Sequence, residues 1–174
     1  MGENAWELQH PRLEDIHPDD FRLVVEFLES GDFGHRHPQG EEQVAETLAH
    51  CMSAWTAAEK LNMDDLLDHI VNKIKSTADD WNMHSMMVFA CFVWQRQSSD
   101  YETEAHDQMK SLLSAYIAEH FFDYVEAEEL RSEFLDRLKQ APDLQTAVFE
   151  KLAGQNRQAQ LAEHDEEDTV DLYE

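Results

Sequence analysis

Apolar residues recur at the spacing of an α-helix along most of this chain, and few residues interrupt that spacing. Only 5 Gly and 4 Pro occur among its 174 residues. Alternating apolar and polar runs joined by Asn-Gly or Asp-Gly turns, which signal β-hairpins, are missing from the sequence. The chain has little from which to build strands, so we predict a mostly α-helical fold, a bundle of about seven helices.

The first long helix is predicted to begin at Pro18 and to end at Gly31. Pro18 suits the first helical position, because its φ is already fixed and an N–H there would have no partner. Gly31 stands where helices commonly end on a glycine. Leu23 and Phe27 extend the apolar arc of this helix beyond what one contact surface needs, so we expect them to lie at a protein interface. The side chains expected to face the core are Phe21, Val24, Val25 and Leu28.

The next two helices are predicted to form a hairpin. From Glu42 to Leu61 apolar side chains fall at i, i+4, i+7, i+8 and i+11, which is the pattern of an amphipathic helix. Asn62 follows directly and suits the cap that starts a second helix, in which the same pattern continues to Ile74. Two helices joined by so short a connection pack against each other.

Two segments of this region resemble the BTB/POZ domain. The run IHPDDF (16–21) followed by VVEFLESGDF is similar to the place where a strand of that domain leads into a proline-started helix and a "Leu-Tyr-Thr-Gly" turn. Residues 57–66, AAEKLNMDDL, resemble the "Ala-Asp-Lys-Leu-Gly-Met-x-x-Leu" segment that joins its last two helices. The pattern over 92–121 is similar to the helical extension of the fungal type of BTB protein.

The resemblance implies a particular domain organisation. An N-terminal segment (1–15) would precede the C-terminal half of a BTB-like domain (16–78), and a BACK-like helical extension (79–155) would follow it, before an acidic tail (156–174). The strands of a complete BTB domain, which form much of its usual homodimer interface, are not matched. The flank around Leu23 and Phe27 would then be covered by self-association, by another protein or by N-terminal apolar side chains, namely Trp6, Leu8 and Leu13.

The same resemblance implies a role. Members of the family are non-catalytic adaptors or scaffold subunits that join proteins, as homodimers or within larger complexes. Some bring substrates to a cullin-type ubiquitin ligase. We therefore expect a protein–protein interaction module that binds its partner through apolar helix surface, with a ligase substrate adaptor that binds a cullin as the alternative.

The charge of the chain limits its partners. Thirteen Lys and Arg stand against 38 Asp and Glu, a formal net charge of −25. Such a field repels phosphate backbones and anionic lipid headgroups, so we expect neither direct nucleic-acid binding nor membrane binding. A solvated acidic surface and attraction to a basic partner are both consistent with the charge.

Cysteine usage and the N-terminal sequence indicate the compartment. Cys51 and Cys91 both fall within apolar helical patterns, where a reduced thiol behaves as a small apolar side chain. This favours a reducing compartment, the nucleus or the cytoplasm. The first residues lack the basic and apolar regions of a signal peptide, and the apolar run from Met86 to Trp94 is about half of a membrane span. We therefore expect a soluble protein.

The acidic tail is predicted to be disordered. After Gly154 the apolar periodicity fades, and the sequence EHDEEDTVDLYE is almost wholly acidic. Val170, Leu172 and Tyr173 stand out in it and suit a short linear motif that binds a partner by strand addition. An inert, solubilising tail is the alternative.

Signatures of catalysis and of cofactor binding are missing from the sequence, which contains no G-x-x-x-x-G-K-[ST], G-x-G-x-x-G, H-E-x-x-H or G-x-S-x-G element. We therefore expect neither an enzyme nor a cofactor or metal. His35 and His37 in the polar loop 32–41, together with His50, keep a metal-binding protein or metalloenzyme as an alternative, although a zinc site takes three or four ligands. His120 is expected to be a hydrogen-bonded core histidine.

Overall fold

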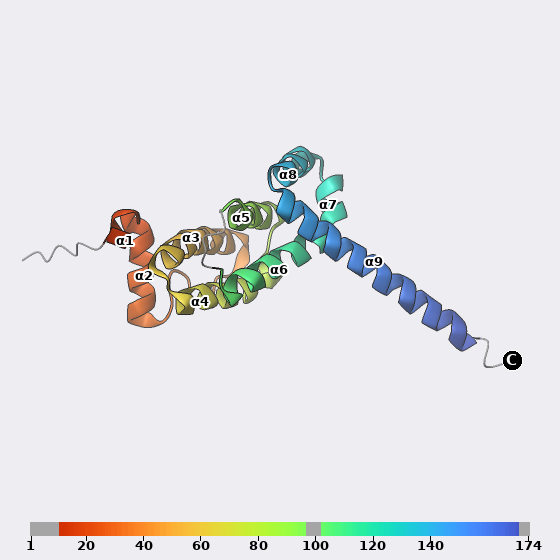
Figure 1. Ribbon diagram of the computed structural model, residues 1–174, viewed down its shortest axis with the longest axis horizontal. Coiled ribbons are helices and arrows are strands. Elements are labelled where there is room, and N and C mark those ends of the chain that lie inside the picture. The colour runs from red at the N-terminus through yellow and green to blue at the C-terminus, as the bar shows by residue number, and fades with distance from the viewer. Residues whose placement is uncertain (1–10, 97–101, 171–174) are drawn as a thin grey trace, which may run out of the picture. The chain divides into compact units, whose positions relative to one another are not determined.

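The computed structural model describes residues 11–96 and 102–170, with side chains placed over 13–96 and 102–157. All regular structure in these ranges is helical, which confirms the all-α prediction (Figure 1). The elements are α1 (Pro11–Glu14), α2 (Pro18–Ser30), α3 (Gly40–Leu61), α4 (Asp64–Lys75), the 3-10 helix η1 (Ala78–Asp80), α5 (Met83–Gln95), α6 (Glu104–Glu119), α7 (Phe121–Glu126), α8 (Glu128–Gln140) and α9 (Pro142–Val170).

The described ranges contain two more α-helices than the expected seven, because α1 and α7 are very short. They have four and six residues, fewer than two turns each. A segment of that length cannot show a helical repeat in its sequence. The break that separates α7 from α8 is Ala127, whose extended backbone interrupts an otherwise continuous helical pattern.

The chain divides into two compact units. Unit 1 comprises Met1–Ser85 with Ser98–Gln108, and unit 2 comprises Met86–Gln97 with Met109–Glu174. The sequence-based prediction placed a boundary between a domain at 16–78 and an extension at 79–155. Instead, the first turns of α6 belong to unit 1, where they carry His106 against Trp55 of α3, with ring centroids 5.0 Å apart.

In unit 1, α3 and α4 form the predicted hairpin, and α2 runs across it (Figure 1). Asn62 has a role different from the expected one: it ends α3 instead of starting α4. It adopts the left-handed conformation, with φ 56° and ψ 51°, and α4 begins two residues later without a side-chain cap. Asparagine is among the few residues that tolerate this conformation, which explains why it stands between the two helices.

The orientation of α2 corrects the expectation about its apolar arc. Pro18 starts the helix and Gly31 ends it with φ 72°, both as predicted. Leu23, which we expected at an open interface, is buried in the chain itself at 2% exposure. Leu28, which we expected in the core, is 66% exposed. The apolar arc of α2 is too wide for one contact, and the edge that becomes buried is decided by the packing of α2 against α3 and α4.

In unit 2, the helices α7, α8 and α9 pack around two aromatic rings. Tyr124 and Phe134 are both fully buried, and their rings stack with centroids 4.4 Å apart and planes 13° apart. The residues of α5 in this unit are apolar around most of the helix, as expected, and Met86 and Phe89 are fully buried. No helix in the described ranges is long and apolar enough to cross a lipid bilayer.

The last helix, α9, continues to Val170, where we expected a disordered tail from residue 156 onward. Residues 155–162, QNRQAQLA, contain good helix formers and no proline, so local propensity allows the backbone to continue as a helix. The final residues, 171–174, lie outside the described part of the chain.

Candidate functional site

Three phenylalanines of unit 2 form a contiguous aromatic patch. Phe121 and Phe122 begin α7, and Phe149 lies on α9. The ring of Phe121 lies 5.6 Å from that of Phe122 and 6.0 Å from that of Phe149, measured between centroids. We call these three residues the aromatic patch. Phe122 is 68% exposed and Phe149 is 47% exposed, so the patch presents two large apolar rings to solvent.

The aromatic patch is fixed to the core of unit 2 through Phe121. This half-buried ring meets Phe134 edge-on, with centroids 5.6 Å apart and planes at 71°. Phe134 in turn stacks on buried Tyr124. Aromatic contacts of this kind add to the stabilisation that burial provides, and they hold the rings in defined positions. The exposed rings therefore project from a rigid base.

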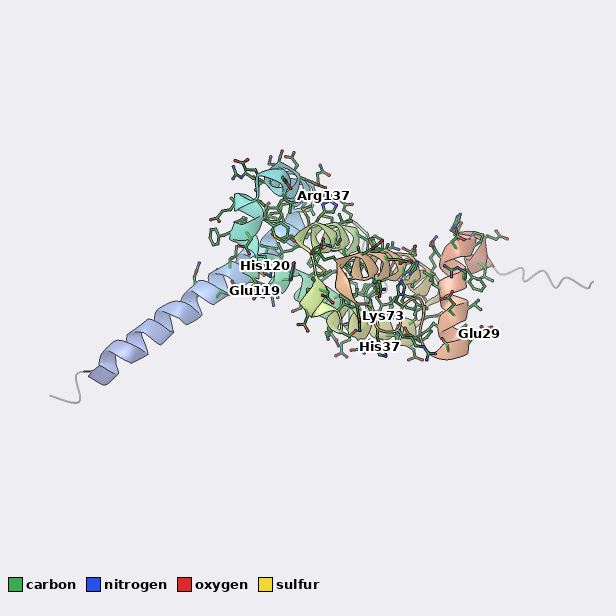
Figure 2. The ribbon with its side chains drawn as sticks, turned by 180° about the vertical axis from the view of Figure 1, so that it is seen from behind. Glu29, His37, Lys73, Glu119, His120 and Arg137 are labelled. Atoms are coloured by element: carbon green, nitrogen blue, oxygen red, sulfur yellow. The ribbon has the colours of Figure 1, made fainter. Side chains whose placement is uncertain are left out.

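The patch has an acidic border. The eleven residues from Glu119 to Glu129 include five carboxylates and no Lys or Arg. His120 lies at the start of α7 and is half-exposed (Figure 2). This corrects the expectation that it lies in the core. Its Nδ1 lies 2.9 Å from Oδ2 of Asp123, and its ring lies 4.5 Å from that of Tyr116. The histidine thus has a structural partner at the junction of α6 and α7.

A partly buried ion pair in unit 1 holds the loop after α2 against α4. Lys73, labelled in Figure 2, donates from Nζ to Asp32 Oδ1 at 2.6 Å and to the carbonyl oxygen of His35 at 2.7 Å. His69 Nε2 donates to the same Oδ1 at 2.9 Å. Burial alone would raise the pKa of Asp32, but hydrogen bonds from Lys73, His69 and the backbone N–H of Phe33 outweigh it and lower that pKa.

The ion-pair cluster combines residue types found in catalytic sites, but its hydrogen bonds fix structure. His69 makes its hydrogen bond to Asp32, and no described Ser, Thr or Cys bonds to its ring. A nucleophile needs a neighbouring base within hydrogen-bond reach, which this cluster does not supply. In the contact between Glu59 and His106, Nε2 donates to Oε1 at 3.0 Å, and Nδ1 lies 3.2 Å from the backbone N of Thr103 and 2.9 Å from its Oγ1. Thr103 directly precedes α6 and His106 is the third residue of that helix, so the contacts between these two residues cap the start of α6.

The described surface of unit 1 is hollowed in places, and two of these hollows are well formed. The larger, of about 480 Å³, lies between α4 and the start of α6 and is lined by Asp64, Asp68, Glu104, Asn72 and Gln108 among others. The smaller, of about 190 Å³, lies beside the end of α2. The larger hollow is lined mostly by polar side chains and the smaller by polar and apolar surface in equal measure, whereas small-molecule pockets are mostly apolar. Neither resembles a ligand site.

The histidine loop does not form a metal site in the structure. His35 Nε2 lies 3.0 Å from Glu46 Oε2, and the hydrogen bond lowers the pKa of that carboxyl group. The described residues contain no group of three or more His, Cys, Asp or Glu side chains placed to hold a metal ion. Nδ1 of His50 is buried and unbonded, and it would lie 3.0 Å from a Cβ added at Gly34.

The structure distributes the expected interface residues among different environments. Leu23 is buried, and half-buried Phe27 packs its ring 5.2 Å from that of His69. Trp6, Leu8, Leu172 and Tyr173 lie outside the described residues, and Val170 is described only as the last residue of α9. None of these residues joins the aromatic patch in the described part of the chain.

Sequence reasoning missed the aromatic patch, although a signal was present. Phe121, Phe122 and Tyr124 fall within four residues, and neighbouring helical positions point about 100° apart. One helix face can bury Phe121 and Tyr124, which are three residues apart, but it then exposes Phe122. The same geometry applies to buried Val148 and exposed Phe149 on α9.

Comparison of the chain with protein-family models, with curated proteins and with solved structures gives no match.

Proposed function

We propose that this chain is a non-catalytic protein–protein interaction module whose binding surface is the aromatic patch of unit 2. The observation that carries the proposal is the exposure of Phe122 and Phe149 on a rigid base formed by Phe121 and Phe134. The exposed parts of these rings remain in water, where they do not contribute apolar burial to the chain itself. They gain contact area when a partner covers them.

The chemistry of the patch is that of a binding hot spot. Aromatic side chains contribute a large share of interface energy, and they lose few rotatable bonds on binding. Here the third ring, Phe121, already holds its two exposed neighbours in place, so binding would order fewer side chains. A patch of this kind suits the core of an interface, with the carboxylates around it as a polar rim.

The proposal of a non-catalytic role draws support from the polar residues. The histidines that face carboxylates, His69 and His106, share their hydrogen bonds with Asp32 and Glu59 inside the helical framework. Their geometry stabilises the packing of α4 and α6 in unit 1. The larger hollow of this unit is lined mostly by polar side chains, whereas substrate pockets are mostly apolar.

We further propose that residues 16–78 represent the C-terminal half of a BTB-like domain and that a BACK-like helical extension follows. The order of elements supports this proposal: a proline-started helix ends at Gly31, and the hairpin of α3 and α4 carries the segment 57–66 across its turn. Domains of this family join proteins, which agrees with a binding role. The aromatic patch lies within residues 79–155, so a partner bound there would contact the BACK-like extension and not the BTB-like part.

A capture experiment with the full chain tests the proposed function. Phe122→Ser combined with Phe149→Ser removes both exposed rings, and Leu28→Ser on α2 removes an apolar side chain of unit 1 that is about as exposed as Phe122. We expect a partner identified with the unmodified chain to bind the Leu28→Ser variant normally and to lose at least about tenfold in affinity for the double variant. Equal binding by the double variant would refute the proposal.

A further inference from the structure

We propose that the aromatic patch binds a basic, amphipathic helical segment of another protein. This inference rests on the proposed function and adds the chemistry of the partner. It follows from the charges around the patch, from the absence of strands in the described residues and from the charge of the chain as a whole.

The carboxylates that border Phe122 make the patch selective for cations. Asp123, Glu126, Glu128 and Glu129 are exposed, and Glu126 lies four residues after Phe122, on the same side of α7. Glu126, Glu128 and Glu129 form no ion pair or hydrogen bond with the side chains that the structure describes. Arg131, the nearest cation along the chain, donates from Nε to the carbonyl oxygen of Val125.

These carboxylates attract Lys and Arg side chains of a partner. Charged groups at the rim of an interface steer the encounter and select among partners more than they add affinity. A partner segment that places Lys or Arg beside apolar residues would meet both parts of this surface, the rings and the carboxylates. A segment with Asp or Glu in those positions would be repelled.

A second copy of this chain is a poor occupant for the same reason. In a two-fold symmetric contact through the aromatic patch, the acidic run from Glu119 to Glu129 of one copy would lie near that of the other. Each copy also carries a formal net charge of −25, and the repulsion between two chains of that charge further opposes their association. The patch is therefore built for a partner of opposite charge.

The helical form of the partner follows from what unit 2 offers. A peptide that binds as a strand needs an exposed sheet edge, and the described part of unit 2 contains helices only. An amphipathic helix needs no backbone partner, because its own hydrogen bonds are internal. It presents apolar side chains on one face and Lys or Arg at the borders of that face.

Fluorescence anisotropy with two labelled peptides tests the inference on the full chain. Each peptide has about 18 residues, long enough to form a helix, with Leu at helical spacing. One carries Lys at the polar positions and the other carries Gln. We expect the Lys peptide to bind at least about tenfold more tightly than the Gln peptide, and Phe122→Ser to weaken its binding by about tenfold. Circular dichroism checks that the variant is folded.

A matched pair of charge reversals separates the effect of charge near the patch on peptide binding from the effect of the net charge of the chain. Glu126→Lys and Glu41→Lys change the net charge equally, but Glu41 is an exposed residue in the first turn of α3, in unit 1. We expect Glu126→Lys to weaken binding of the Lys peptide by about fivefold and Glu41→Lys by less than about twofold. Equal losses would show that only the overall charge matters and would overturn the inference.

The two peptides also separate this inference from the proposed function. If both bind the chain equally and both lose affinity with Phe122→Ser, the patch is a docking surface but its partner need not be basic. If Phe122→Ser changes the binding of neither peptide, the patch does not dock apolar helices and the proposed function fails with the inference. Association of the chain with itself, lost on Phe122→Ser, would replace the basic partner by a second copy.

Discussion

Lys73 Nζ lies 2.6 Å from Asp32 Oδ1, and the Lys73 side chain is only 4% exposed. The contact joins residues 41 positions apart in the sequence, one in the loop after α2 and the other near the end of α4. Lys73 also lies over the face of Phe33, with its Nζ 5.2 Å from the ring centroid. A buried ammonium group needs such partners, because its transfer from water is unfavourable without them.

Asp32→Ala is expected to destabilise the chain by about 3 kcal/mol, because it leaves the Lys73 ammonium buried without its counterion. The free energy of unfolding, from urea titration followed by circular dichroism, measures the change. Glu29→Ala is the control: Glu29 is exposed near the end of α2 (Figure 2), and its loss should change the free energy by less than about 0.5 kcal/mol. Adding Lys73→Met to Asp32→Ala should restore part of the stability. Equal effects of the two single variants would contradict this account.

The pH dependence of stability is expected to reflect Asp32. The pKa of this carboxyl group is lower in the folded chain than its ordinary value of 3.8, so folding favours the charged form. Its contribution is complete above that ordinary value and disappears as the pH falls through the lower, folded-state pKa. The difference in unfolding free energy between the unmodified chain and Asp32→Asn should therefore shrink below about pH 4. A constant difference down to about pH 2 would exclude this coupling.

His106→Ala is expected to destabilise unit 1 by about 2 kcal/mol. His106 is 7% exposed, its Nε2 donates to Glu59, and its Nδ1 lies within hydrogen-bond reach of the N–H and the hydroxyl of Thr103. Loss of the ring leaves these groups short of a partner. His37→Ala, which removes an exposed ring from the loop after α2, should change stability by less than about 0.5 kcal/mol. Thermal unfolding monitored by circular dichroism compares the two variants. Matching midpoints would mean that the His106 contacts contribute nothing.

The substitution of Gly by Ala is expected to have opposite effects at two positions. At Gly31 the backbone has φ 72°, and an added Cβ meets no atom within 4 Å, so Gly31→Ala should destabilise by about 1 kcal/mol through the backbone alone. Gly154 lies within α9 in ordinary helical conformation, and Gly154→Ala should favour that helix by about 0.5 kcal/mol. Urea titration and helix content by circular dichroism measure both. Effects of the same sign would contradict this explanation.

Much of the fold can be predicted from local sequence. Pro18 and Gly31 mark the two ends of α2 because each restricts or permits a particular backbone conformation, and the apolar repeat predicts α3 and α4 as a hairpin. The edge of α2 that becomes buried could not be predicted. Leu23 and Leu28 are equally apolar, and their burial at 2% and exposure at 66% depend on packing with helices distant in the sequence.

The candidate site was harder to predict, because it depends on which apolar residues remain uncovered. Phe122 and Phe149 fit the helical pattern of their segments and resemble core residues by type alone. Their contact through Phe121 requires the arrangement of α7 against α9, which no local pattern encodes. Likewise, Asp32 and Lys73 carry no sign in the sequence that they form a pair.

The two cysteines are divided between the units, with Cys51 in unit 1 and Cys91 in unit 2. Both are buried, at 0% and 2% exposure, and burial raises the pKa of Cys51 to about 12 and also raises that of Cys91. Thiol reagents attack the exposed thiolate, so each cysteine can react only when its surroundings open. Each unit therefore contains one buried cysteine whose rate of labelling by a thiol reagent reports how often that unit opens, independently of the other.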